Sequence, residues 1–158
     1  MPASLAVRAA TIRDVPPLVT LINTAFVVER HFVNRDRTDI NEVAVYLEKG
    51  TFLIAEGADG GFDASVYLQT HGDRGYIGML AVNPTLQGHG IGRQMMTAAE
   101  QYCRAAGCRA VDIKIVNLRT ELPPFYRKLG YADCGTAPFD DPKLTKPAHF
   151  ILMAKSLV

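Results

Sequence analysis

The sequence predicts an α/β fold of the α+β kind, with a mixed, mostly antiparallel sheet of about six to seven strands and about four helices. Short apolar segments of strand character are interleaved with segments whose apolar residues follow helical spacing. A glycine-rich stretch at 87–93 joins a predicted strand to a predicted helix. Because 48% of the 158 residues are apolar, the chain can bury a sizeable core, and we expect a single domain over residues 1–158.

The first half of the chain predicts two helices and four strands. Asp14 is placed to cap a helix that opens with two prolines and runs to about residue 27. The polar stretch 28–37 is expected to be a loop. Asp39 and Glu42 have the spacing of a capping box, which opens a second helix that Gly50 ends. The predicted strands span 6–9, 51–56, 62–69 and 75–82.

The second half begins with a helix that runs from the glycines to about Ala106 and ends at Gly107. A buried strand over 110–116 follows, and then a short helix that reaches Leu129 with Gly130 at its end. Two strands, 131–136 and 149–155, complete the predicted sheet. The apolar face of the first of these helices is predicted to consist of Ile91, Met95, Ala98, Tyr102 and Ala105.

The stretch 87–93 has the character of a phosphate-binding turn. Glycines let the main chain approach an anion closely, and a helix start adds unpaired N–H donors and the positive end of the helix dipole. A P-loop would need Lys and Ser or Thr after Gly92, but Arg93 and Gln94 stand there. A dinucleotide-binding loop needs G-x-G-x-x-G spacing, which is absent, although Asp112 lies where that motif places an acid. A nucleotide-dependent oxidoreductase is therefore disfavoured.

A third pattern, Q/R-x-x-G-x-G/A after a strand, is matched by Gln87, Gly90 and Gly92 without a gap. Two further segments occur in the same order, Met-Leu-Ala-Val-Asn-Pro at 79–84 and Phe-Tyr-Arg-Lys-Leu-Gly-Tyr at 125–131. Together they resemble the GNAT superfamily of acyl-CoA-dependent N-acyltransferases over nearly the whole chain. The resemblance implies that acetyl-CoA is the cofactor and that the fourth and fifth strands splay apart.

The resemblance also implies roles for individual residues. Backbone groups of Leu80, Ala81 and Val82 would take the thioester and the pantetheine arm, with Leu80 also counted as catalytic, and Tyr126 would protonate the departing thiolate. Gly78 in the same strand suggests a bulge or a close backbone approach, or else a simple packing glycine. The residues expected to bind the cofactor are Leu80, Ala81, Val82, Gln87, Gly88, His89, Gly90, Ile91, Gly92, Arg93, Asn117 and Tyr126.

Two positions depart from the family. Where some members carry a glutamate in the fourth strand, this chain has Tyr76, which is no base near neutral pH. Arg119 stands where the family often has a cofactor-contacting Asn, and Asn117 lies two residues earlier. The acceptor-site candidates are Glu29, His31 and Arg119, and the base candidates are Glu29, His31, His71 and Asp73. Two further alternatives for the base are a residue that acts through ordered water and solvent alone. Segment 136–142 is expected either to wall the pocket or to join a dimer.

Charge and cysteine content limit the partners. A net charge of +1 predicts no nucleic acid and no anionic membrane surface as partner. Cys103, Cys108 and Cys134 lack C-x-x-C spacing, and no metal site is expected. Residues 1–10 have no secretory h-region, so a cytoplasmic location is expected. The sequence thus predicts an acetyltransferase that acts on a primary amine, and a homodimer is a possible assembly. The alternative is a non-catalytic module that binds or senses acyl-CoA.

Overall fold

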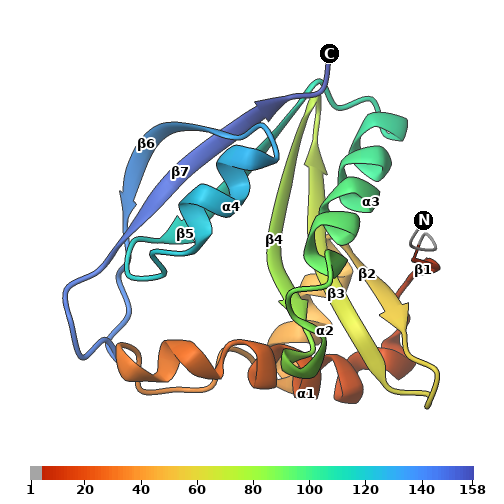
Figure 1. Ribbon diagram of the computed structural model, residues 1–158, viewed down its shortest axis with the longest axis horizontal. Helices are drawn as coiled ribbons and strands as arrows, with labels where there is room; N and C mark the ends of the chain where they lie inside the picture. The colour runs from red at the N-terminus through yellow and green to blue at the C-terminus, as the bar shows by residue number, and fades with distance from the viewer. Residues whose placement is uncertain (1–4) are drawn as a thin grey trace.

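The computed structural model describes residues 5–158 and is centred on one seven-stranded sheet (Figure 1). The strand order is β1-β2-β3-β4-β5-β7-β6, and every neighbouring pair is antiparallel except β4 and β5. This confirms the predicted mixed, mostly antiparallel sheet. The strands are β1 (Val7–Ala9), β2 (Thr51–Glu56), β3 (Phe62–His71), β4 (Arg74–Val82), β5 (Ala110–Val116), β6 (Ala132–Pro138) and β7 (His149–Ser156).

Helices cover both faces of the sheet. The α-helices are α1 (Val15–Ala25), α2 (Ile40–Lys49), α3 (Ile91–Ala105) and α4 (Leu122–Lys128), and short 3-10 turns are η1 (Ile12–Asp14), η2 (Val27–His31) and η3 (Pro84–Leu86). Alternation along β2 decides which core each residue joins. Leu53 and Ala55 pack on the side of α3 and α4, whereas Phe52 and Ile54 pack against α1 and α2. No helix among residues 5–158 has the length and apolar character to cross a membrane.

The parallel pair β4 and β5 is joined only at one end. Arg74–Tyr76 of β4 pair with Ala110–Asp112 of β5, and the two strands then diverge (Figure 1). This confirms the predicted splay. Beyond Tyr76, the main-chain groups of β4 that face β5 have no strand partner within residues 5–158, so a bound molecule can use them.

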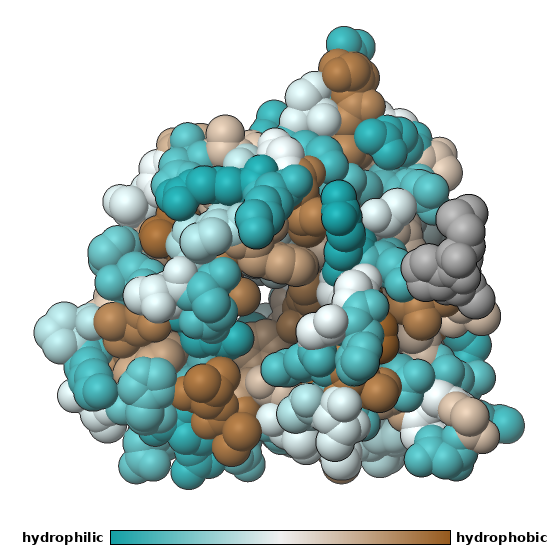
Figure 2. Space-filling model, in the orientation of Figure 1, coloured by the Kyte–Doolittle hydropathy of each residue, from teal (hydrophilic) through white to brown (hydrophobic). Residues whose placement is uncertain are grey.

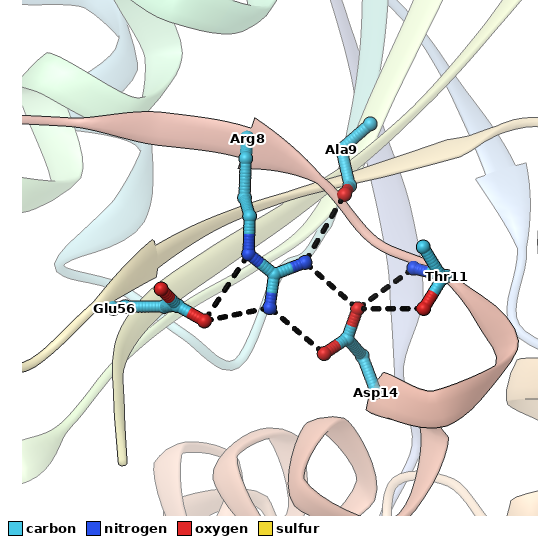
Figure 3. Close-up of polar contacts among 5 residues, drawn as sticks. All are labelled: Arg8, Ala9, Thr11, Asp14 and Glu56. Carbon is cyan, nitrogen blue, oxygen red and sulfur yellow. Dashed lines mark hydrogen bonds and ion pairs between the residues drawn. The ribbon is translucent and has the colours of Figure 1, made fainter. Parts of the chain in front are cut away.

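An arginine in β1 ties the sheet to the start of α1. Figure 3 shows the guanidinium of Arg8 between the carboxylates of Asp14 and Glu56, with nitrogen–oxygen distances of 2.7–2.9 Å. The side chain of Asp14 therefore does not cap α1 as predicted; it accepts from Arg8 and from the backbone N–H of Thr11. The bonds from Arg8 lower the pKa of Asp14 from 3.8 to about 2 despite its burial.

Two further local predictions need correction. Asp39 caps α2 by accepting from the Glu42 N–H, but the Glu42 carboxylate accepts from Thr38 Oγ1, so the capping box is only half formed. The predicted loop 28–37 begins with the 3-10 turn η2, which buries Glu29. Residues 1–4, which belong to the segment predicted to carry no secretory signal, lie outside the described residues.

The buried face of α3 is rotated from the predicted one. Tyr102 and Ala105 are exposed, whereas the buried positions are Met95, Met96, Ala99, Glu100 and Cys103. The apolar residues Met96, Ala99 and Cys103 form this face together with Glu100, whose carboxylate accepts from the hydroxyl of Tyr131 and from Lys155 Nζ, both at 2.8 Å. A carboxylate with two such partners can be buried, and hydropathy spacing assigns it to solvent.

Candidate functional site

The glycine-rich loop forms the N-terminus of α3. Gly88 and Gly90 have φ of 86° and 77°, which residues with a Cβ adopt only at an energetic cost, and Gly90 is the N-cap of the helix. The backbone N–H of Gln94 donates to the carbonyl of Gly90, so the three amides before it have no acceptor within the helix. The loop therefore presents free N–H donors at the positive end of a 15-residue helix.

These amides border a cavity of about 530 Å³, which we call the loop cavity. It lies between the loop, the end of β4 and the start of α4. The predicted cofactor residues that line it are Leu80, Val82, Gln87, Gly88, Gly90, Ile91, Gly92 and Arg93. Most of the predicted binding residues are thus brought together around one hollow.

Four predicted cofactor residues do not line the loop cavity; Tyr126 lines the neighbouring cavity described below, and the other three line neither. The side chain of Ala81 is buried in the core against α1, so only its main chain is available to a ligand. His89 is exposed and does not line the loop cavity. The side-chain oxygen of Asn117 accepts from the His149 N–H at 2.8 Å, which holds the start of β7, and Asn117 lines neither this cavity nor the next.

A second cavity, of about 710 Å³, occupies the gap between the diverging strands, and we call it the sheet cavity. Phe26, Leu80, Arg119 and Leu122 line both cavities, so the two meet where β4 leaves β5. Figure 2 shows the hollow at the centre of the molecule in this region. A ligand in the loop cavity can therefore meet a second ligand that enters from the sheet cavity.

The main chain of β4 is irregular at this junction. Between the pairs Tyr67–Gly78 and Ser65–Ala81, two residues of β4 oppose the single Val66 of β3, and Met79 has φ of 49°. A Cβ on Gly78 would lie 2.7 Å from the hydroxyl oxygen of Tyr76, so any larger residue would force the Tyr76 ring to shift. The bulge that Gly78 suggested is therefore confirmed, and it lies directly after this residue.

Tyr126 reaches the sheet cavity from α4. It is 7% exposed, and among residues 5–158 its hydroxyl has no hydrogen-bond partner. Burial raises the pKa of Tyr126 well above its usual range, although the charge of Arg119 acts in the opposite direction. The phenol is therefore protonated at neutral pH and free to donate its proton to a ligand.

Two of the acceptor-site candidates form an ion pair at the junction. Arg119 Nη1 lies 2.9 Å from a carboxylate oxygen of Glu29, and Arg119 Nε lies 2.6 Å from Glu121. Both members of the first pair are largely buried, with side chains 15% and 11% exposed. The guanidinium of Arg119 also stands 5.8 Å from the centre of the Phe26 ring. The structure thus places Glu29 and Arg119 at one point of the cavity wall.

The other base candidates are dispersed. His31 is exposed, and its Nδ1 lies 2.6 Å from the carbonyl oxygen of Val28, so that nitrogen donates a proton. Asp73 is exposed in the turn before β4. His71 lines the sheet cavity at the end of β3, with Nε2 2.7 Å from the side-chain oxygen of Gln69. Only Glu29 and His71 of these four candidates line the cavity.

The far end of the sheet cavity is closed by a contact that the sequence did not reveal. The orange segment after α1 lies beside the blue loop between β6 and β7 (Figure 1), joined by the bridge pair Val33 and Leu144. Arg35 Nε and Asp141 form an ion pair at 2.6 Å across the same contact. The loop after β6 thus walls the pocket, which was one of the two expectations for segment 136–142. The contact itself joins segments that are far apart in the sequence, so local sequence patterns could not predict it.

Comparison with known proteins agrees with this geometry. The profile of the acetyltransferase (GNAT) family matches residues 31–131, more than half of the chain. Similar curated proteins are a streptothricin acetyltransferase from Streptomyces lavendulae, 34% identical over 86 residues, and an IAA acetyltransferase from Azospirillum brasilense, 32% identical over 71 residues. The first match covers 52% of this chain and 45% of the relative, and the second covers 45% of this chain and 46% of the relative. The chain thus spans about half the length of the relatives it matches.

Solved structures extend the resemblance of fold to nearly the whole chain. A phosphinothricin acetyltransferase from Sinorhizobium meliloti in complex with AcCoA has a TM-score of 0.79 at 15% identity, covering 98% of this chain and 89% of that one. The ribosomal-protein-S18-alanine N-acetyltransferase from Escherichia coli has a TM-score of 0.79 at 15% identity, covering 96% and 93%. At such identities the likeness shows the fold alone. The chain belongs to the acetyltransferase (GNAT) family.

Proposed function

We propose that this protein transfers the acetyl group of acetyl-CoA to a primary amine of an acceptor. The observation that carries the proposal is the junction of the two cavities, where the unpaired main chain of β4 and the free hydroxyl of Tyr126 face the same space. A donor in the loop cavity and an acceptor in the sheet cavity would meet at this point.

The residues of the loop cavity fit coenzyme A. The positive φ of Gly88 and Gly90 turns the main chain around an anion, and the amides at the start of α3 can bind pyrophosphate oxygens. Arg93 adds a positive charge beside them. The side chains of Leu80, Val82 and Phe125 give an apolar wall that suits the pantetheine arm. Bound acetyl-CoA would supply a thioester, whose carbonyl carbon is bonded to the amine nitrogen as the carbon–sulfur bond breaks.

The residues at the junction act on the two charges that this exchange creates. The β4 bulge lies at Met79 and Leu80, and Leu80 lines both cavities; we assign the Leu80 N–H to the developing negative charge on the carbonyl oxygen. Tyr126 gives its proton to the departing sulfur. The amine loses one proton, which restores the phenol through solvent, so the products are an amide and a thiol.

The test is a thiol-release assay with acetyl-CoA and a panel of primary amines. Release of one thiol for each amide formed supports the proposal. Tight binding of acetyl-CoA with no turnover of any amine would instead favour the non-catalytic binding module. Absence of both binding and turnover would contradict both functions.

A further inference from the structure

Charge is unevenly compensated on the wall of the sheet cavity. Its basic lining residues are Arg35, Arg37, Lys114 and Arg119, and its acidic ones are Glu29, Asp140 and Asp141. The ion pairs Arg119–Glu29 and Arg35–Asp141, at 2.9 and 2.6 Å, account for two residues of each sign. What remains is Arg37, which is half-buried, together with Lys114 and Asp140, which are both exposed. The wall of the cavity therefore carries one more basic residue than acidic residues.

Arg37 lies close to the junction. Its guanidinium stands 5.3 Å from the centre of the Phe26 ring, and Phe26 lines both cavities. Its nearest carboxylate, Glu42, is 3.7 Å away and already accepts from Thr38 at 2.7 Å. The charge of Arg37 also opposes the rise that burial causes in the pKa of Tyr76, which places it within electrostatic reach of the ring over the β4 bulge.

Lys114 comes from the opposite wall, on β5. Its Nζ stands 4.7 Å from the centre of the Phe150 ring, and among residues 5–158 it has no carboxylate within ion-pair distance. Arg37 and Lys114 thus rest on aromatic faces and keep their N–H donors for a ligand. A cavity built in this way attracts a negatively charged group, because the half-buried Arg37 is stabilised by any counter-ion that enters, and the exposed Lys114 adds positive charge from the facing wall.

We infer that the acceptor is a primary amine that also carries a carboxylate or a comparable acid group, bound by Arg37 and Lys114 in the sheet cavity. The inference rests on the proposed function, because it assumes that the sheet cavity takes the acceptor. It also bears on the missing carboxylate of β4. Nearby positive charge disfavours the ammonium form of an amine, so the same cations increase the fraction of neutral, nucleophilic amine at a given pH.

The experiment compares matched pairs of amines that differ in the acid group, such as phenylalanine with phenethylamine and 4-aminobutyrate with butylamine. The rate measured is kcat/KM from thiol release, expressed per concentration of neutral amine so that the different basicities of the amines cancel. A charge-assisted bond in a partly buried site predicts a preference of about tenfold or more for the acid-bearing member. Arg37→Gln and Lys114→Gln are expected to bring this ratio toward one.

Arg30→Gln is the matched control, because Arg30 lies on the same segment, pairs with Asp36 at the surface and does not line the cavity. It should leave the ratio unchanged. A second readout is calorimetric binding of each amine to protein saturated with coenzyme A, in which the acid-bearing members should bind more tightly by a similar factor.

Equal or better use of the acid-free amines would overturn the inference while leaving the acetyltransferase proposal intact. So would a ratio that neither Arg37→Gln nor Lys114→Gln changes. If no member of the panel is acetylated, the calorimetric titration decides, and failure of the acid-bearing members to bind overturns the inference. Failure of acetyl-CoA itself to bind would instead overturn the proposed function.

Discussion

Replacing Gly90 by alanine would test the backbone conformation of the loop separately from its size. A Cβ at this position would meet no atom within 4 Å, so steric contact does not oppose the change. The φ of 77° does oppose it, because the left-handed region costs an L-residue about 1–2 kcal/mol. The penalty should therefore be of this size and purely conformational.

The penalty can appear in two measurable quantities. If the loop keeps its conformation, the free energy of unfolding in urea falls by about 1–2 kcal/mol without ligand. If the loop relaxes, its amides leave the anion site, and the affinity for acetyl-CoA falls by about 5–30-fold in calorimetry. We expect the two losses to add up to the cost of the left-handed conformation, whichever way it is divided.

Gly92→Ala is the matched control. This residue does not have a positive φ, and a Cβ there would lie 3.5 Å from the ring of Phe125, which is an ordinary contact. Alanine at a helical position gains up to about 1 kcal/mol over glycine, so stability should hold or rise. Equal damage from both substitutions, or no damage from Gly90→Ala, would refute the account of the loop.

Three other predictions follow from buried polar groups. Tyr126→Phe should lower kcat by about tenfold or more, and because burial raises the pKa of Tyr126, the wild-type pH–rate profile should show no alkaline loss from this phenol below about pH 10. Asp14→Asn should lower the free energy of unfolding by about 2 kcal/mol at neutral pH, because Arg8 holds the pKa of Asp14 at about 2. That stabilisation is complete above pH 3.8 and is lost as the pH falls through about 2, so urea midpoints of the two proteins should converge in acid. Glu29→Gln should destabilise the protein by about 1–3 kcal/mol in the same assay, since it removes the buried partner of Arg119, and an unchanged midpoint would show that Glu121 suffices.

The parts of the site that the sequence could predict are those set by local chemistry. Gly88 and Gly90 are needed because the main chain is left-handed there. Since glycine is the residue that adopts a positive φ most readily, such a turn can be recognised from the sequence. The strand before the loop and the helix after it follow from spacing alone. Tyr126 could be placed because it stands in a contiguous motif on a short helix, and the helix carries it to the cavity.

The parts that the sequence could not predict depend on partners far along the chain. Glu29 has the polarity of a surface residue, yet it is buried because Arg119, 90 residues later, bonds to it. Glu100 is buried on α3 for the same reason, since its partners Tyr131 and Lys155 come from other elements. Arg37 and Lys114 belong to no motif, and only the closure of the cavity brings both to its wall.

The splay of β4 and β5 joins these observations into one physical account. Tyr76 stands where some members of the family carry a glutamate, and its ring lies over Gly78, the residue before the bulge. The bulge holds Met79 at a positive φ, which is a strained conformation for a side chain with a Cβ and persists because its side chain is packed in the core against α1. The main-chain groups of β4 that face β5 beyond Tyr76 have no strand partner among residues 5–158, and Arg37 and Lys114 add positive charge to the cavity wall. In the proposed reaction, a site of this kind would assist the transfer by stabilising negative charge on the donor and by favouring the neutral form of the amine, and neither effect requires a carboxylate on β4.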